Sequence, residues 1–263
     1  MEKSQLTSSR KNEMLERGFL GNYFREVANV IEERGLISKI QGLEITVKSK
    51  IPIGSGLASS AALTVAFAAL LDNAFGLGLS RKDLAEISYI SESERVGTHC
   101  GRLELYGVCF GGVIRLECQQ PYNVEQLPFT NLTFAIANSG TRHSTQDVHP
   151  KRQREINRGL KALMESQAPP ELKAKLGVSF DQLRWDVLKE KELAEYLSIL
   201  DDEARCRILF TIRTNALNNL ALKVLRFEPM SAEDLSSRLS LVQLNHIQKL
   251  RQSERDWQIL GEL

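Results

Sequence analysis

The sequence predicts an α+β protein, because strand patterns occur in its first half and helical patterns dominate its second half. Residues 43–49 alternate apolar and polar side chains, which is typical of a half-buried strand. Short apolar runs at 113–116 and 132–138 predict two further strands, and the second is followed by Ser139-Gly140. From about residue 150 onward, apolar side chains recur at helical spacing instead.

Caps and apolar spacing predict the helices. A serine followed three residues later by a carboxylate is a capping box, and glycine commonly ends a helix. Residues 97–112 are dotted with glycine and are predicted to be irregular, and 167–170 are a candidate linker. The expected helices are one from Asn22 to before Gly35, one from Ser59 or Ser60 to Gly76, one from Ser80 to about Glu94, and those at 152–164, 190–200, 204–225 and 231–251.

Composition narrows the class of protein. The chain has 263 residues, of which 42% are hydrophobic and 25% charged, as in ordinary globular proteins. Neither a signal-peptide core nor an apolar run long enough for a bilayer is seen, so a cytoplasmic protein without membrane contact is expected. The formal charge of +1 and a basic cluster without interleaved aromatics, at 151–154, argue against a nucleic-acid partner. The four cysteines lack CxxC spacing, which favours reduced thiols over disulfides or zinc.

The sequence is organised around a glycine-serine loop at 51–62, between a predicted strand and a predicted helix. Glycine lets backbone N–H groups approach an anion, and the helix start adds unpaired donors and a positive dipole end. A phosphate cradle is one interpretation, and a plain strand-to-helix turn is the other. The loop lacks the lysine of a P-loop, which excludes that class, whereas Ser59-Ser60 offer hydroxyls to a phosphate or to Mg²⁺.

Three motifs carry a family resemblance. Residues 52–62, Pro-Ile-Gly-Ser-Gly-Leu-Ala-Ser-Ser-Ala-Ala, resemble the Pro-x-x-x-Gly-Leu-Gly-Ser-Ser-Ala signature of GHMP kinases, with Ala58 where Gly or Ser is usual. Residues 91–104 resemble the galactokinase segment Ala-Glu-x-x-Phe-x-Gly-x-x-Cys-Gly-Ile-Met-Asp-Gln, and 138–144 resemble its Asn-Ser-x-x-x-His-x-Leu region. The three occur in the family's order, over roughly residues 22–251.

The resemblance implies an ATP-dependent kinase that uses Mg²⁺ and phosphorylates a hydroxyl of a small polar metabolite, with galactose-like sugars first. It implies that Ser60, or alternatively Ser59, binds Mg²⁺ together with Glu92, for which Glu94 is the competing ligand. The residues implied to bind ATP are Pro52, Gly54, Ser55, Gly56, Leu57, Ala58, Ser59 and Ser60.

The acceptor side departs from the family pattern. The resemblance implies Glu104 as the catalytic carboxylate, where the family has Asp, and Leu105 follows where the family has Gln. A glutamate can accept a proton from a hydroxyl, but its reach differs by about one bond, and about 1 Å of misplacement can cost about a hundredfold in rate. Gly101 and His149 are the implied substrate-binding residues, with His149 where galactokinases carry Tyr.

The resemblance also implies two lobes: an ATP-binding lobe at 1–140, with a left-handed strand–helix–strand crossover, and a helix-rich lobe at 141–263. The family's N-terminal sugar-binding motif and C-terminal glycine-rich motif are not found, so both lobes are expected to be partial. An incomplete sheet leaves unpaired edges, which favours a homodimer or a partner that supplies the missing elements. The alternative hypothesis is a non-catalytic or truncated homologue that binds nucleotide or sugar without turnover.

Overall fold

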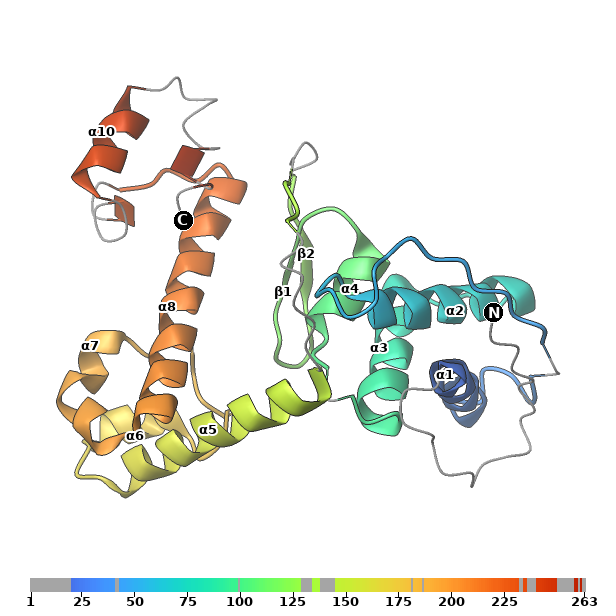
Figure 1. Ribbon diagram of the computed structural model, residues 1–263, viewed down its shortest axis with the longest axis horizontal. Coiled ribbons are helices and arrows are strands. Elements are labelled where there is room, and N and C mark those ends of the chain that lie inside the picture. Colours follow the sequence, from blue (N-terminus) through green and yellow to red (C-terminus); the bar gives the residue numbers. More distant parts are fainter. Residues whose placement is uncertain are drawn as a thin grey trace. The chain divides into compact units, whose positions relative to one another are not determined.

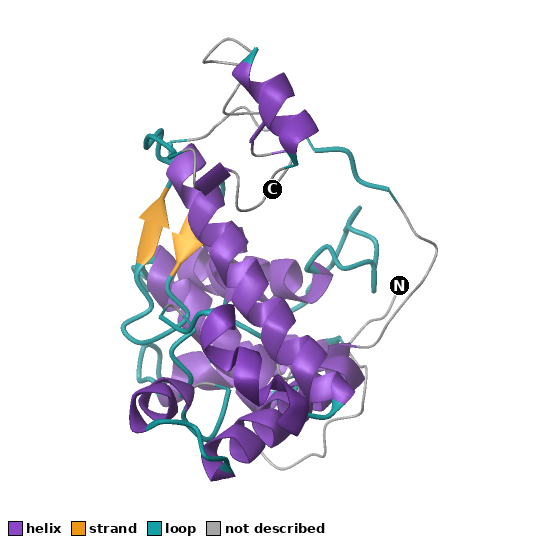
Figure 2. Cartoon of the chain, turned by 90° about the vertical axis from the view of Figure 1, so that its left-hand side faces the viewer, coloured by secondary structure: helices purple, strands orange, loops and turns teal. Residues whose placement is uncertain are grey.

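The computed structural model describes residues 20–40, 43–98, 100–128, 134–137, 145–180, 182–185, 187–231, 234–235, 240–249, 258–259 and 261. The chain forms two compact units, Met1–His149 and Pro150–Leu263. Helices make up most of both, and the one sheet among the described residues is an antiparallel pair (Figure 2). The predicted α+β class is therefore observed, in a helix-rich form.

Three helices form the core of the first unit (Figure 1): α1 (Gly21–Glu33), α2 (Ser59–Phe75) and α3 (Arg81–Tyr89). The apolar face of α1 buries Val27 and Ile31 completely, and the Phe24 ring lies 4.7 Å from the Phe67 ring of α2. Gly76 ends α2 in the left-handed conformation, as predicted. The predicted Ser80–Asp83 capping box opens α3, with Ser80 Oγ accepting from the Asp83 N–H at 3.1 Å.

The rest of the first unit contains an element that the sequence analysis missed. After α3 the chain continues as a π-helix, η1 (Ile90–Arg95), and then forms helix α4 (Leu103–Phe110). Residues 97–112 were predicted to be irregular because of their glycines, and for 103–110 this prediction is wrong. Strand β1 (Ile114–Leu116) lies within the strand predicted at 113–116 and pairs with β2 (Val124–Gln126).

Two predicted strands are not formed in the described residues. Residues 44–50 have no ladder partner, and 43 makes only an isolated bridge. Residues 134–137 are likewise without strand structure, with Phe134 and Ile136 exposed, and the rest of that predicted strand lies outside the described residues. A strand needs a neighbour for its backbone hydrogen bonds, and the described part of the chain supplies none here. The left-handed crossover therefore stays an expectation.

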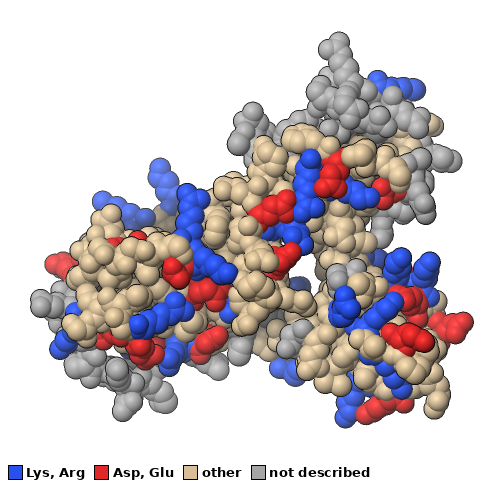
Figure 3. Space-filling view, turned by 180° about the vertical axis from the view of Figure 1, so that it is seen from behind, with Lys and Arg blue, Asp and Glu red and all other residues tan. Residues whose placement is uncertain are grey.

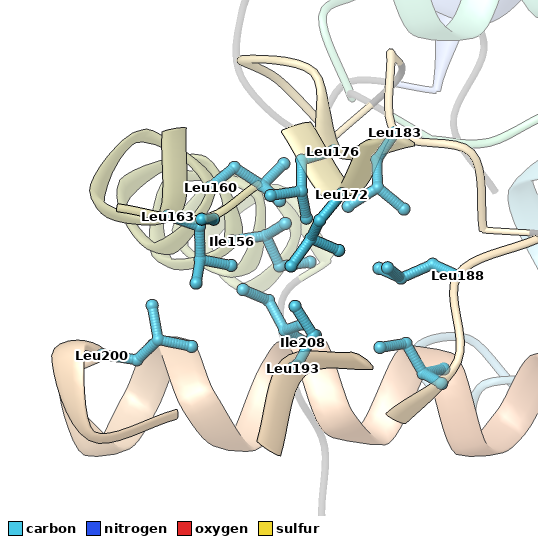
Figure 4. Packing of buried hydrophobic residues seen from close by; sticks show 12 residues of the cluster. Ile156, Leu160, Leu163, Leu172, Leu176, Leu183, Leu188, Leu193, Leu200 and Ile208 are labelled. Carbon is cyan, nitrogen blue, oxygen red and sulfur yellow. The ribbon is translucent and has the colours of Figure 1, made fainter. Parts of the chain in front are cut away.

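The second unit is built on two long helices: α5 (Thr145–Glu165), which belongs to this unit from Pro150 onward, and α8 (Asp202–Leu225). The shorter helices are α6 (Pro170–Leu176), α7 (Glu190–Leu193), the 3₁₀ helix η2 (Ala194–Ile199) and α10 (Leu241–Gln248). Leucine and isoleucine side chains from α5 to α8 fill its core (Figure 4). Gly159 lets α5 approach α8 closely, because a Cβ there would lie 2.8 Å from Ile208 Cδ1 and 2.9 Å from Ala204 Cβ. Residues 167–170, the candidate linker, connect α5 directly to α6, which begins at Pro170.

Charge is mixed over the surface. Lys and Arg side chains are interspersed with Asp and Glu on the face seen in Figure 3. On this face, the pattern agrees with the formal charge of +1. Within the described residues, no helix combines the length and the hydrophobicity that crossing a bilayer requires.

Candidate functional site

The glycine-serine loop has an unusual backbone. Gly54, Gly56 and Ala58 all have positive φ, of 68°, 76° and 51°, so every second residue is in the left-handed region. Ala58 is the N-cap of α2, with φ 51° and ψ 40°, and no side chain caps the helix. A Cβ is strained in that conformation, which explains why glycine would suit position 58 better.

The loop exposes donors rather than using them. Residues 52–57 are exposed, and Ser55 Oγ donates to the Pro52 carbonyl at 2.8 Å, which closes the turn. Among the described residues, no hydrogen bond uses the backbone N–H groups of residues 54–60 as donors. The prediction that Ser59 or Ser60 caps α2 is wrong, since both are its first helical residues. Their hydroxyls therefore lie on the first turn of the helix, beside unpaired N–H groups.

Glu92 is a buried carboxylate directly behind this helix start. It lies in η1, is 2% exposed, and accepts a hydrogen bond from the Thr64 hydroxyl at 3.3 Å. The Ser60 hydroxyl lies close enough to Glu92 to act on the pKa of its carboxyl group. Burial raises the pKa of Glu92, the Ser60 and Thr64 hydroxyls oppose that rise, and the nearby Glu104 adds to it. Such a carboxylate gains strongly from a cation beside it.

The backbone around Glu92 is fixed by its neighbours. Its carbonyl accepts from the Thr98 N–H at 3.2 Å and from the Thr98 hydroxyl at 2.9 Å. Ser91 Oγ donates to the Ile87 carbonyl at 2.7 Å, one helical turn earlier. π-helical turns within helices are frequent at functional sites. Glu94, the competing ligand of the sequence analysis, is exposed on the same turn, so the structure favours Glu92 as the residue that points inward.

Glu104 brings a second carboxylate to the same place. It lies in the first turn of α4, its side chain is exposed, and it is close enough to Glu92 to raise the pKa of that group. Cys100 is near both: burial and then Glu92 raise the pKa of its thiol to about 12, and Glu104 adds to this. Burial and Glu92 likewise raise the pKa of Tyr23 to about 12. Both groups therefore stay neutral near pH 7.

The structure says less about the other predicted site residues. Gly101 is exposed just before α4, and a Cβ there would lie 4.0 Å from Glu104 Oε2, so it borders the Glu104 carboxylate. His149 lies within α5, but its side chain is outside the described residues. Residues 138–144, the third motif, also lie outside them. The structure thus brings together Ser60, Glu92 and Glu104 and leaves the acceptor side open.

Thr64 is a site residue that the sequence analysis missed. Its hydroxyl donates to the Ser60 carbonyl at 2.9 Å as well as to Glu92, and its side chain is fully buried. It lies four residues after Ser60 and therefore on the same helix face, which is the signal that could have found it. A buried threonine in an otherwise alanine-rich apolar helix is a second sign.

The site has the donors that Mg²⁺ prefers, a carboxylate and hydroxyls. Within the described residues there is no group of three or more His, Cys, Asp or Glu that could hold a metal ion by themselves. Magnesium in phosphoryl-transfer sites usually takes one or two carboxylates and completes its shell with phosphate oxygens and water. Glu92 and Ser60 fit that requirement as a partial ligand set beside the loop.

Comparison with known proteins identifies the first part of the chain. Residues 22–112 match the family model of the GHMP kinases N terminal domain. The chain is galactokinase-like. It is 45% identical to the galactokinase of Thermosipho africanus over 89 residues, 34% of this chain and 25% of that protein. It is 31% identical to the galactokinase of Thermococcus kodakarensis over 161 residues, 59% of this chain and 45% of that protein.

The fold has a solved counterpart. A crystal structure of Lactococcus lactis galactokinase complexed with galactose matches 81% of this chain, with a TM-score of 0.54 and 20% sequence identity. The match covers 53% of that galactokinase chain, and the chain spans less than half the length of the curated relatives named above. The recognition made from the three motifs is confirmed, and the match to GHMP kinases covers the loop, Glu92 and Glu104.

Proposed function

We propose that this chain is an ATP-dependent kinase that transfers the γ-phosphoryl group to a hydroxyl of a sugar or sugar-like metabolite. The observation that carries the proposal is the meeting of Ser60, Glu92 and Glu104 beside a loop whose backbone donors have no acceptor among the described residues. The similarity to galactokinases makes galactose the first acceptor to test. In this proposal residues 1–140 are the ATP-binding lobe and 141–263 the second lobe.

Each residue then has a defined task. The loop from Pro52 to Ser60 binds the triphosphate through its free N–H groups and the α2 dipole. Ser60 and Glu92 would hold Mg²⁺, which neutralises charge on the phosphoryl oxygens. Thr64 orients the Glu92 carboxylate through its hydroxyl.

Glu104 is the proposed base or charge stabiliser for the acceptor hydroxyl. It is exposed at the start of α4, and the described residues give its carboxylate no hydrogen-bond or ion-pair partner. A carboxylate left free in this way can accept the proton of a bound hydroxyl. Gly101 and His149 are the proposed contacts to the acceptor, and Gly101 leaves room next to Glu104.

The experiment is a coupled ADP-release assay with Mg²⁺-ATP across galactose, other hexoses, uronic acids and mevalonate. Turnover with one sugar class that needs Mg²⁺ supports the proposal. The matched variant is Glu104→Asp, which restores the family's carboxylate at that position. Turnover that rises in this variant shows that the reach of Glu104 limits the rate.

The second candidate is a homologue that binds nucleotide or sugar without turnover. It is favoured by Leu105, which stands where the family pattern has Gln and is fully buried against Ala61 and Val65 of α2. A position committed to packing cannot contact the acceptor. Nucleotide-dependent stabilisation without ADP release on any acceptor, in both wild type and Glu104→Asp, would favour this second candidate.

A further inference from the structure

An arginine clamp joins the start of α4 to α3. Arg102, the N-cap of α4, donates from Nε to Glu86 Oε1 at 2.8 Å and from Nη2 to Glu86 Oε2 at 3.2 Å. The Tyr106 hydroxyl, one helical turn later, donates to the same Oε1 at 2.7 Å. Burial alone would raise the pKa of Glu86, but the bonds from Arg102 and Tyr106 outweigh it and hold that pKa below its ordinary value. Glu86 is therefore ionised and bound by both residues.

Two tyrosine rings hold the same guanidinium from its flat faces. Arg102 Cζ lies 3.6 Å from the centre of the Tyr89 ring and 4.0 Å from that of Tyr122. The Arg102 and Glu86 side chains are only 18% and 20% exposed, so this pair is shielded from solvent far more than a surface ion pair. A planar guanidinium can make a two-pronged carboxylate contact and stack on aromatic rings at once, which lysine cannot do.

The clamp stands directly beside Glu104. The Arg102 carbonyl accepts the first helical hydrogen bond of α4, from the Tyr106 N–H at 2.9 Å. On the other side of Glu104, Leu105 is fully buried against Ala61 and Val65 of α2, the helix whose first turn carries Ser60. The first turn of α4 is thus bound to α3 through Arg102 and to α2 through Leu105.

We propose that Arg102 is a positioning residue, which fixes the first turn of α4 so that the Glu104 carboxylate faces the Ser60–Glu92 site. The predicted effect of Arg102 on the reaction rate rests on the proposed function, whereas its predicted effect on the rigidity of the first turn of α4 does not. Arg102 does not touch the reacting groups in this account and acts only through the backbone that carries Glu104. The motif that the segment resembles has an isoleucine at this place, and an isoleucine could not form this clamp.

The clamp also bears on the longer carboxylate. A glutamate has one more rotatable bond than the aspartate of the resembled motif, so its oxygens spread over a larger volume. Misplacement of about 1 Å can cost about a hundredfold in rate. Among the described residues, the Glu104 side chain has no partner that would hold it in one position. A rigid first turn of α4 therefore limits the spread of its oxygens by fixing the backbone that carries it.

The test compares Arg102→Met, Arg102→Lys and Glu86→Gln with the control Arg115→Met in the full chain. Arg115 also pairs with a glutamate, Glu117 at 2.8 Å, but that pair lies at the β1–β2 hairpin and is not part of the Arg102–Glu86 cluster. The readouts are kcat and KM for the acceptor found in the ADP-release assay, the shift of the melting temperature by Mg²⁺-ATP, and amide hydrogen exchange of residues 103–107.

The expected result is a fall in kcat of about 10- to 100-fold in Arg102→Met, a smaller fall in Arg102→Lys, and an unchanged Mg²⁺-ATP shift. Exchange of residues 103–107 rises in the Arg102 and Glu86 variants and not in Arg115→Met. A kcat within twofold of wild type, or an equal loss of the Mg²⁺-ATP shift, overturns the proposal.

If wild type itself has no turnover, the proposed function fails and exchange decides the positioning role. Faster exchange confined to 103–107 then supports it, and unchanged exchange overturns it. Should Arg102→Met fail to fold, Arg102→Lys and Glu86→Gln carry the same comparison, because each keeps a side chain of similar size in the cluster.

Discussion

Replacing Glu92 by glutamine should stabilise the nucleotide-free protein and at the same time remove its response to Mg²⁺-ATP. Burial raises the pKa of Glu92, so the folded state holds its proton more tightly than the unfolded state does. Its contribution to stability is complete below the ordinary carboxyl pKa of 4.5 and is lost as pH rises through the folded pKa. Glutamine avoids this loss because it carries no charge to bury.

The size of the effect follows from these terms. Each pKa unit between the folded and unfolded states corresponds to about 1.4 kcal/mol. For a domain of this size, 1 kcal/mol shifts the melting temperature by about 2–4 °C. Glu92→Gln should therefore raise the melting temperature near pH 7.5, and the gain should shrink as pH falls toward 4.5.

Mg²⁺-ATP should reverse the order of the melting temperatures of wild type and Glu92→Gln. At a concentration of about 100 times its Kd, Mg²⁺-ATP stabilises wild type by about 2.7 kcal/mol. Glu92→Gln should lose most of that shift, because glutamine is a poor replacement for a carboxylate ligand. The assay is thermal unfolding from pH 4.5 to 8 with and without Mg²⁺-ATP, and Glu94→Gln, exposed on the same turn, is the control.

Two results would refute this reasoning. A lower melting temperature in nucleotide-free Glu92→Gln would mean that the carboxylate stabilises the fold through its hydroxyl contacts instead of opposing it through burial. A Mg²⁺-ATP shift equal to that of wild type would mean that Glu92 has no part in binding the metal.

Three other experiments have definite expected outcomes. Glu104→Gln should lower kcat by about 10²- to 10⁴-fold in the ADP-release assay and leave the Mg²⁺-ATP thermal shift intact, since it removes only the base. Ala58→Gly should leave the free energy of unfolding unchanged or raise it by up to about 1 kcal/mol, because glycine relieves the strain of the left-handed backbone. The control Ala61→Gly, inside α2, should lower the free energy of unfolding by about 1 kcal/mol. Gly159→Ala should lower the free energy of unfolding, measured in urea, by about 1–3 kcal/mol, because the added Cβ meets α8. The control Gly107→Ala, whose Cβ would have no atom within 4 Å, should raise the free energy of unfolding by about 0.5–1 kcal/mol.

Each has an outcome that contradicts it. For Glu104→Gln the contradicting outcome is unchanged turnover. For Ala58→Gly and Ala61→Gly it is an equal loss of the free energy of unfolding in both variants. For the glycine pair it is a gain in stability at position 159, which would mean that α5 and α8 are not in close contact there.

Local rules predicted much of the fold correctly. The Ser80–Asp83 box, the Gly76 helix end and the long helix at 204–225 depend on neighbouring residues, and the structure has all three, with α8 starting at Asp202. The strands at 43–49 and 132–138 were not found in the described residues, because a strand is completed only by a partner. Helix α4 was missed because its interior glycine and the glycines on both sides of it suggest a loop, while its burial at Leu105 and Tyr106 depends on α2 and α3.

The site was predictable where motifs are contiguous. Ser60 and Glu92 were paired from the family resemblance, and the structure adds the burial of Glu92 and its hydrogen bond from Thr64, which no spacing could give. Thr64 and the Arg102 clamp depend on side chains that meet across helices, as with Arg102 and Glu86, which are 16 positions apart and share a hydrogen bond of 2.8 Å. The raised pKa of Glu92 is likewise a property of the packed unit.

The most direct test of the account is calorimetric titration of the full chain with ATP, with and without Mg²⁺. The account predicts that ATP binds, that Mg²⁺ tightens the binding in wild type, and that Glu92→Gln abolishes this gain. Absence of ATP binding at millimolar concentration, or binding that ignores both Mg²⁺ and the loss of Glu92, would contradict the claim that the 52–60 loop and Glu92 form one Mg²⁺-ATP site.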